Sequence, residues 1–169
     1  ILLFSHAGSG LEEAVAYSPY AKSEYPQSVY WGDTHIHTEM SMDANSTGDR
    51  LSQEAAYRFA KGETVVSSSG VSMRLSRPLD FVVLADHAEF MGYFPLIRKG
   101  DPKAGDSGWG RFFEAGNDFD LLMAIVNLSL AEDMQGKSRE LGLKQDWEIL
   151  GDVWRETTAL ADRYNVPGQ

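Results

Sequence analysis

The sequence predicts an α/β protein, in which strands of a parallel sheet alternate with amphipathic helices. Residues 29–37 are rich in Val, Tyr, Trp, Thr and Ile, which favour strands. Residues 81–85 form an unbroken apolar run, which is typical of a strand buried on both faces of a parallel sheet. Residues 119–134 and 143–164 repeat apolar side chains at the spacing of a helix.

Shorter signals predict the elements in between. Ser52 can cap a helix that ends before Gly62, a residue suited to a left-handed helix end. Residues 64–75 predict a hairpin around a Ser-Ser-Gly turn. The polar residues 40–49 and the Gly-, Asp- and Pro-rich residues 99–110 predict loops. We expect the Trp and Phe residues beyond position 109 to lie in the core.

Composition excludes several partners and chemistries. The 169 residues are enough for one domain, and the formal net charge is -10. Such a charge argues against nucleic acid or an anionic membrane as the main partner. No apolar run approaches the roughly 20 residues that a membrane helix needs. Because there are no cysteines, any metal must be held by His, Asp or Glu.

The first residues differ in character from the rest. Residues 1–28 lack a sustained period and predict an N-terminal arm ahead of one domain over residues 29–169. Residues 1–4 are apolar and are followed by small residues, as at the end of a signal peptide. This pattern predicts a periplasmic or secreted protein, and the alternative is an ordered arm on a cytoplasmic one.

Two histidines give the first sign of a functional site. His35 and His37 are two residues apart on a predicted strand, so both imidazoles point to the same side. They stand at the end of that strand, where α/β proteins place their sites. Asp43 follows in a predicted loop and could fold back towards them, or could be a solvated loop residue. The sequence therefore predicts a metal site with nitrogen and oxygen ligands.

A third histidine ends the second predicted strand. His87 follows the apolar run, and Asp86 precedes it as a potential hydrogen-bond acceptor that fixes the imidazole. The alternative is a histidine satisfied in the core. Glu89 could be a hydrogen-bond partner, a substrate contact or a charge at the start of a helix.

These residues resemble the polymerase-and-histidinol-phosphatase (PHP) superfamily. The similar segments are Gly-Asp-Thr-His-Ile-His-Thr at 32–38, Ser-Met-Asp-Ala at 41–44 and Leu-Ala-Asp-His-Ala-Glu-Phe at 84–90. Together with residues 76–81, they are similar to a long PHP-like branch known as a domain of unknown function. The resemblance covers about residues 29–94. It implies the N-terminal part of a distorted barrel of strands and helices, with extra helices after the second barrel strand.

The resemblance also implies two or three divalent ions, Zn, Mn or Fe, at the carboxyl ends of the strands. Four residues match ligand positions: His35, His37, Asp43 and His87. Asp86 and Glu89 would be the acidic groups that assist catalysis. The implied reaction is hydrolysis of phosphoesters or related esters of small molecules by metal-activated hydroxide.

The family pattern requires further ligands that are not found here. It needs a later Glu and more histidines, yet no histidine follows His87. We therefore expect a second chain to supply the C-terminal part of the same polypeptide; the alternative is a true truncation that binds metal poorly. Two other functions stay open, which are a non-catalytic binding or structural module and a metal-dependent hydrolase of amides or sulfate esters.

Overall fold

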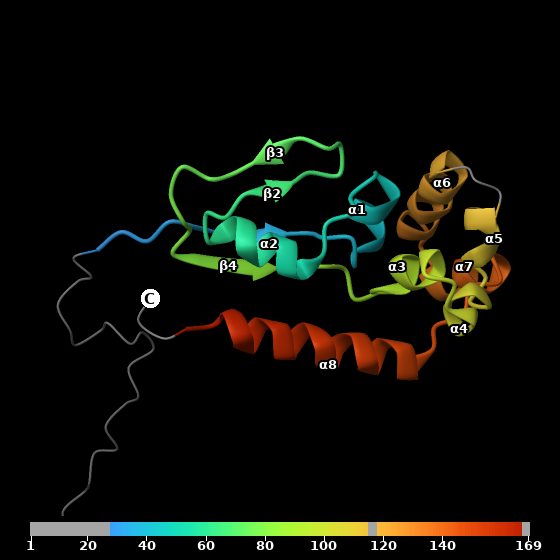
Figure 1. Ribbon diagram of the computed structural model, residues 1–169. Coiled ribbons are helices and arrows are strands. Elements are labelled where there is room, and N and C mark those ends of the chain that lie inside the picture. The colour runs from blue at the N-terminus through green and yellow to red at the C-terminus, as the bar shows by residue number, and fades with distance from the viewer. Residues whose placement is uncertain (1–27, 115–117, 167–169) are drawn as a thin grey trace, which may run out of the picture.

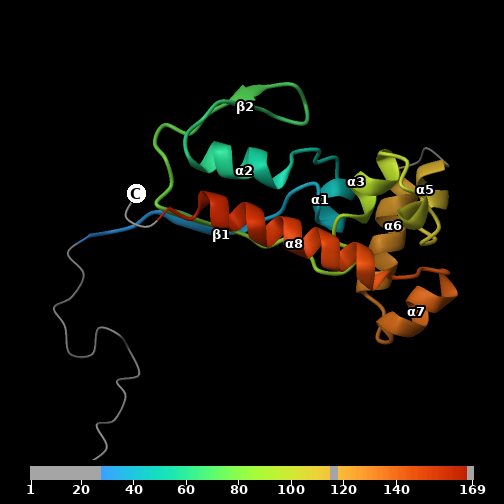
Figure 2. The same cartoon turned by 60° about the horizontal axis from the view of Figure 1, so that its bottom comes forward.

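The computed structural model describes residues 28–114 and 118–166, which form a mixed α/β structure with no closed barrel among them (Figure 1). Strands β1 (Gly32–Ile36) and β4 (Phe81–Leu84) form a parallel sheet whose carboxyl ends point towards a group of short helices. Helix α8 (Trp147–Tyr164) runs back alongside the sheet, as Figure 2 shows. The predicted arm lies almost wholly outside the described residues.

The two strands pair in parallel, as predicted. The register pairs Gly32 with Phe81, Asp33 with Val82 and Ile36 with Leu84, with an irregularity between Asp33 and Ile36. The prediction that residues 81–85 are buried on both faces is wrong, because Phe81 is 44% and Val83 is 48% exposed. Side chains alternate along a strand, and within the described residues one face of β4 is left uncovered.

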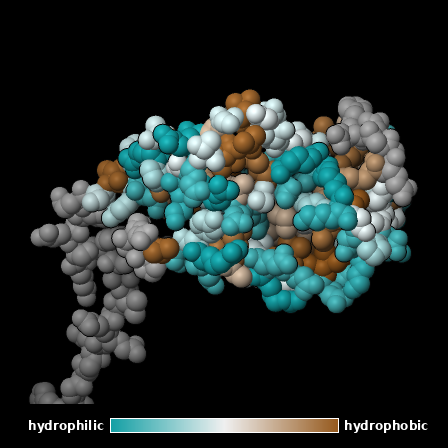
Figure 3. All heavy atoms as spheres, in the orientation of Figure 1, coloured by the Kyte–Doolittle hydropathy of each residue, from teal (hydrophilic) through white to brown (hydrophobic). Residues whose placement is uncertain are grey.

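Helix α2 (Gln53–Ala60) connects the two strands and begins and ends as predicted. The Ser52 hydroxyl accepts the Ala55 N–H, and Gly62 has a left-handed backbone with a φ of 78°. The predicted hairpin is confirmed as β2 (Val65–Val66) paired antiparallel with β3 (Ser72–Met73). Its exposed apolar side chains form a patch in Figure 3: Val66, Val71 and Met73.

Both predicted loops contain short helices. Residues 40–49 include α1 (Met42–Ser46), and residues 99–110 include α4 (Pro102–Gly105), so both loop predictions are wrong in part. The Asp101 carboxylate caps α4. Helices of one turn are too short to show a periodic pattern in the sequence. Such helices are stabilised by caps and tertiary contacts.

The remaining helices are α3 (Tyr93–Arg98), α5 (Gly110–Glu114), α6 (Asp118–Ser129) and α7 (Met134–Glu140). The predicted helix at 119–134 is therefore interrupted, and the one at 143–164 begins later, after the Asp146 cap. Trp147 and Trp154 are 77% and 61% exposed, so the prediction that they lie in the core is wrong. Across the described residues, none of the helices has the length and apolar character needed to span a membrane.

The core lies among the helices at the carboxyl ends of the strands. Tyr93, Phe94 and Trp109 are almost completely buried. Phe90 packs edge-on against both Tyr93 and Trp109, with ring centroids 5.3 Å apart in each pair. Met42 of α1 belongs to the same cluster. Helix α1 is therefore held against the core, next to the strand ends.

Gly92 shows how tightly α3 and α8 approach each other. Its φ is 78°, and a Cβ atom there would lie 2.8 Å from Val153 Cγ2. We predict that Gly92→Ala lowers the free energy of unfolding by about 2–4 kcal/mol, because backbone strain and overpacking add. Gly70→Ala is the control, since Gly70 has a φ of 85° and open space around it. Urea unfolding of both variants is the measurement, and equal losses would contradict the role of Val153.

Candidate metal centre

Four predicted site residues meet at the carboxyl ends of β1 and β4. His35 lies in β1, His37 directly follows it, Asp43 lies in α1, and His87 follows β4. Ligand atoms of His37, Asp43 and His87 lie within 4.8 Å of one another, so these residues could hold a metal ion. His35 is not part of this group, but it contacts His37, because the Nε2 atoms of His35 and His37 are 3.0 Å apart.

The two ring nitrogens of His37 face different neighbours. Nδ1 lies 2.8 Å from Asp43 Oδ2, and Nε2 faces His35 Nε2. An ionised carboxylate can only accept a hydrogen bond, so Nδ1 carries the proton of a neutral ring and Nε2 carries its lone pair. His37 is therefore oriented as a metal ligand through Nε2, with a carboxylate behind it.

The Asp43 carboxylate is stabilised in its charged form. Burial raises its pKa, but hydrogen bonds from the Ser41 hydroxyl at 2.5 Å, the Ala44 N–H at 2.7 Å and His37 together lower it more. The pKa of Asp43 therefore lies below its ordinary value of 3.8. Asp43 is thus an anion at neutral pH, as a ligand of a divalent cation needs to be.

His87 approaches the same carboxylate from β4. Its Nε2 lies 3.4 Å from Asp43 Oδ2, and its ring meets that of His37 edge-on, with centroids 5.0 Å apart. On the other side of the ring, Nδ1 is 3.9 Å from Glu89 Oε2. Glu89 is about half exposed, so it stands at the open side of the cluster.

The hydrogen bonds of the Asp86 carboxylate go to Thr38 and Gln53 and not to the imidazoles. Its Oδ1 accepts the Thr38 N–H at 2.6 Å, and its Oδ2 accepts the Thr38 hydroxyl at 3.0 Å and the Gln53 amide at 2.8 Å. The two hydrogen bonds from Thr38 tie the end of β4 to the residue after His37, and the third ties it to α2. The geometry gives Asp86 a positioning role, and its predicted catalytic role stays a prediction.

Sequence reasoning missed three polar residues that organise the site. Ser41 is fully buried, donates to Asp43 and accepts the N–H of His87 at 3.0 Å. Thr38 and Gln53 are also buried and hold Asp86. A serine two residues before an acidic residue is a weak sign of such a contact, and nothing local in the sequence signals the role of Gln53.

The donor set suits a transition metal. Imidazole and carboxylate ligands bind Zn, Mn and Fe alike. Two imidazole nitrogens bound to one tetrahedral zinc at about 2.0–2.1 Å lie about 3.3 Å apart, close to the separation of His35 and His37. The distance between the two Nε2 atoms is therefore compatible with a shared ion.

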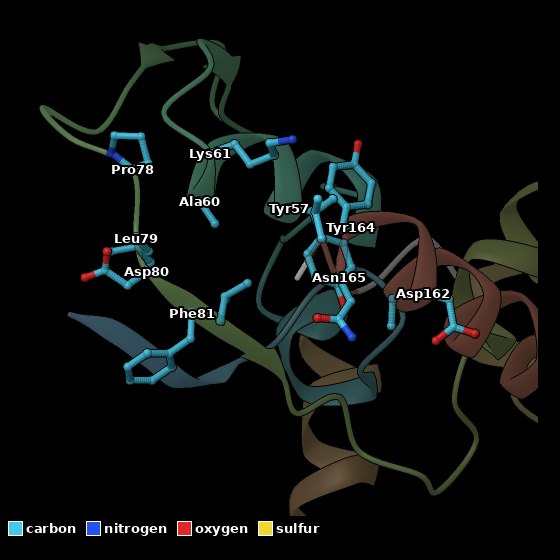
Figure 4. Close-up of a pocket in the computed structure, with 13 residues that line it drawn as sticks. Tyr57, Ala60, Lys61, Pro78, Leu79, Asp80, Phe81, Asp162, Tyr164 and Asn165 are labelled. Carbon is cyan, nitrogen blue, oxygen red and sulfur yellow. The ribbon is translucent and has the colours of Figure 1, made fainter. Parts of the chain in front are cut away.

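A pocket of about 600 Å³ lies elsewhere (Figure 4). It is lined by the first residues of β4 and by the ends of α2 and α8, including Phe81, Tyr57 and Tyr164. The two tyrosine rings stack with centroids 4.8 Å apart and occupy one side of it. Because the histidines stand at the other end of the strands, the pocket is not part of the candidate metal centre.

The geometry defines an α/β protein with a histidine and aspartate cluster at its strand ends that could hold a metal ion. Residues 24–169 match the family described as "Protein of unknown function (DUF3604)", and the chain belongs to this family. No curated protein and no solved structure matches the chain. Membership of the PHP superfamily stays a prediction.

We predict that Ser41→Ala lowers the free energy of unfolding by about 1–3 kcal/mol, because the His87 N–H loses its buried acceptor. Ser46→Ala is the control, because the buried Ser46 hydroxyl donates only to the carbonyl of Asp43 within its own helix. Urea unfolding and the amide chemical shift of His87 are the measurements. If Ser41→Ala and Ser46→Ala change the free energy of unfolding and the His87 amide shift by the same amount, Ser41 does not organise the site.

Proposed function

We propose that the chain forms part of a metal-dependent hydrolase that cleaves phosphoesters or related esters of small molecules. The observation that carries the proposal is the convergence of His37, Asp43 and His87 at the ends of two parallel strands, with His35 beside them. Sites of α/β proteins gather at this edge of the sheet. The resemblance of residues 29–94 to the PHP superfamily supports phosphoesters as substrates, and amides or sulfate esters are the alternative.

We propose that these donors serve two divalent ions. His35 and His37 offer facing Nε2 atoms to one ion, and Asp43 Oδ2 and His87 Nε2 lie 3.4 Å apart for a second. We propose zinc, manganese or iron, since imidazole and carboxylate suit all three. Such ions would supply Lewis-acid activation of water and of the ester.

Glu89 is the group that we propose for proton transfer. Its carboxylate lies beside His87 at the open side of the cluster, where a substrate could reach it. Asp86 is engaged by three donors, so in this proposal it holds the strand ends in place while Glu89 exchanges protons.

We further propose that protein beyond the described residues completes the centre as part of a PHP-type barrel. The exposed Phe81 and Val83 support this, because parallel strands are usually covered on both faces. The partner would be a second chain that carries the C-terminal part of the same polypeptide. The apolar residues 1–4 favour a periplasmic or secreted location.

We predict that the protein in its native assembly binds Co²⁺ or Zn²⁺ and that His37→Ala weakens binding by more than about 100-fold. Loss of a direct ligand exceeds the roughly 10- to 100-fold cost of losing an outer contact. His6→Ala is the control, because His6 is the remaining histidine of the sequence. Metal content and Co²⁺ titration are the measurements. A native assembly without metal, or equal losses in both variants, would contradict the metal centre.

We predict that the metal-loaded assembly releases p-nitrophenol from p-nitrophenyl phosphate or bis(p-nitrophenyl) phosphate, and that Glu89→Gln lowers kcat by about 100-fold or more, as for loss of an acid–base group. Glu54→Gln, at an exposed position of α2, is the control. Turnover of p-nitrophenyl sulfate or an anilide instead would favour the alternative substrates. Tight metal binding without turnover of any of these would favour a non-catalytic module.

A further inference from the structure

We infer that Gln53 and Thr157 are positioning residues of the metal centre, which act on it through the carboxylate of Asp86. The inference rests on the proposed metal-binding function and extends it to α8, a helix that carries none of the ligands. The Thr157 hydroxyl donates to Gln53 Oε1 at 3.1 Å, although the two residues are 104 positions apart in sequence. Gln53 Nε2 donates to Asp86 Oδ2 at 2.8 Å. Hydrogen bonds therefore connect α8 to the end of β4.

The orientation of the Gln53 amide follows from its two neighbours. The Asp86 carboxylate can only accept, so the NH₂ group of Gln53 faces it and Oε1 faces α8. Gln53 is 6% exposed, so water has little access to either end of the amide. An unpaired buried amide is costly, and the contact with Thr157 therefore helps to hold the contact with Asp86.

Asp86 transmits this constraint to both strand ends. Its carboxylate binds the N–H and the hydroxyl of Thr38. Thr38 follows His37 directly, and His87 follows Asp86 directly. A rotation of the Asp86 carboxylate therefore displaces the backbone beside both imidazoles that face Asp43. The positions of the two imidazoles depend on how Gln53 holds this carboxylate.

The contact is not needed to form either helix. Ser52 caps α2 independently of the Gln53 side chain. Helix α8 buries the apolar side chains Ile149, Val153 and Leu160, and such packing has little directional preference. The hydroxyl of Thr157 adds a directional contact to this face. We therefore expect its loss to loosen the metal centre more than the fold.

The test compares Thr157→Val with Thr158→Val, using Co²⁺ as the probe and the full chain in its native assembly. Valine keeps the shape of threonine and removes the hydroxyl. The Thr158 hydroxyl donates only to carbonyls of its own helix, Trp154 and Arg155. We expect Thr157→Val to raise the Kd for Co²⁺ by about 10-fold and to change its d–d absorption, as for loss of an outer contact. Thr157→Ser restores both, and Thr158→Val leaves both unchanged.

A second variant separates positioning from stability. Gln53→Leu removes both hydrogen bonds, and we expect it to weaken Co²⁺ binding at least as much as Thr157→Val. The free energies of unfolding of the variants give the folded fraction of each metal-free chain. The inference requires that the fold-increase in the Kd for Co²⁺ exceeds the fold-decrease in this folded fraction. If Thr157→Val binds Co²⁺ like Thr158→Val, the inference is overturned while the metal centre stands. If the wild-type assembly binds no metal, the proposed function itself fails.

Discussion

The arrangement of the site depends on one carboxylate, that of Asp86. Parallel strands need a long crossover between them, so the ends of β1 and β4 are not joined by a local turn. The Ala85 N–H donates to the Ile36 carbonyl at 2.7 Å, and Asp86 adds side-chain contacts by accepting two hydrogen bonds from Thr38 and one from Gln53. Because charge-assisted hydrogen bonds in a partly buried setting are stronger than neutral ones, this joint fixes the spacing between His37 and His87.

A second set of contacts fixes α1 and with it Asp43. Asn45 is completely buried, its amide donates to the Glu39 carbonyl at 2.7 Å, and its Oδ1 accepts from Arg98. The Gly92 N–H donates to the Met40 carbonyl at 2.9 Å, which links the start of α3 to the segment before α1. Contacts with the aromatic core thus fix the helix that carries Asp43, while Asp86 fixes the strand ends that carry the histidines. The cluster is assembled where these two supports meet.

Patterns in the sequence predict those features of the structure that depend on neighbouring residues, such as the side to which a strand side chain points. Alternation along a strand places His35 and His37 on one side, and their ring centroids are 4.9 Å apart. The apolar run at residues 81–85 predicts a parallel strand, but its burial depends on what covers the sheet, and sequence does not encode that locally. The roles of Gln53 and Ser41 come from partners 33 and 46 residues away, which no periodic pattern reveals. The sequence does not predict helix α1, because a helix of one turn is too short to show a repeating apolar pattern.

The ring of His37 limits how the centre can be occupied. A neutral imidazole has one lone pair, so His37 can bind an ion either at Nε2 beside His35 or at Nδ1 beside Asp43 and His87. Binding at Nδ1 would break the 2.8 Å hydrogen bond to Asp43 and leave Nε2 to carry the proton towards His35. Binding at Nε2 keeps that hydrogen bond and pairs two facing nitrogens. An ion at Nε2 would take the place of the 3.0 Å contact with His35, so each arrangement exchanges one contact of the ring for a metal bond. A single neutral His37 ring can therefore serve an ion shared with His35 or one shared with Asp43 and His87, but not both.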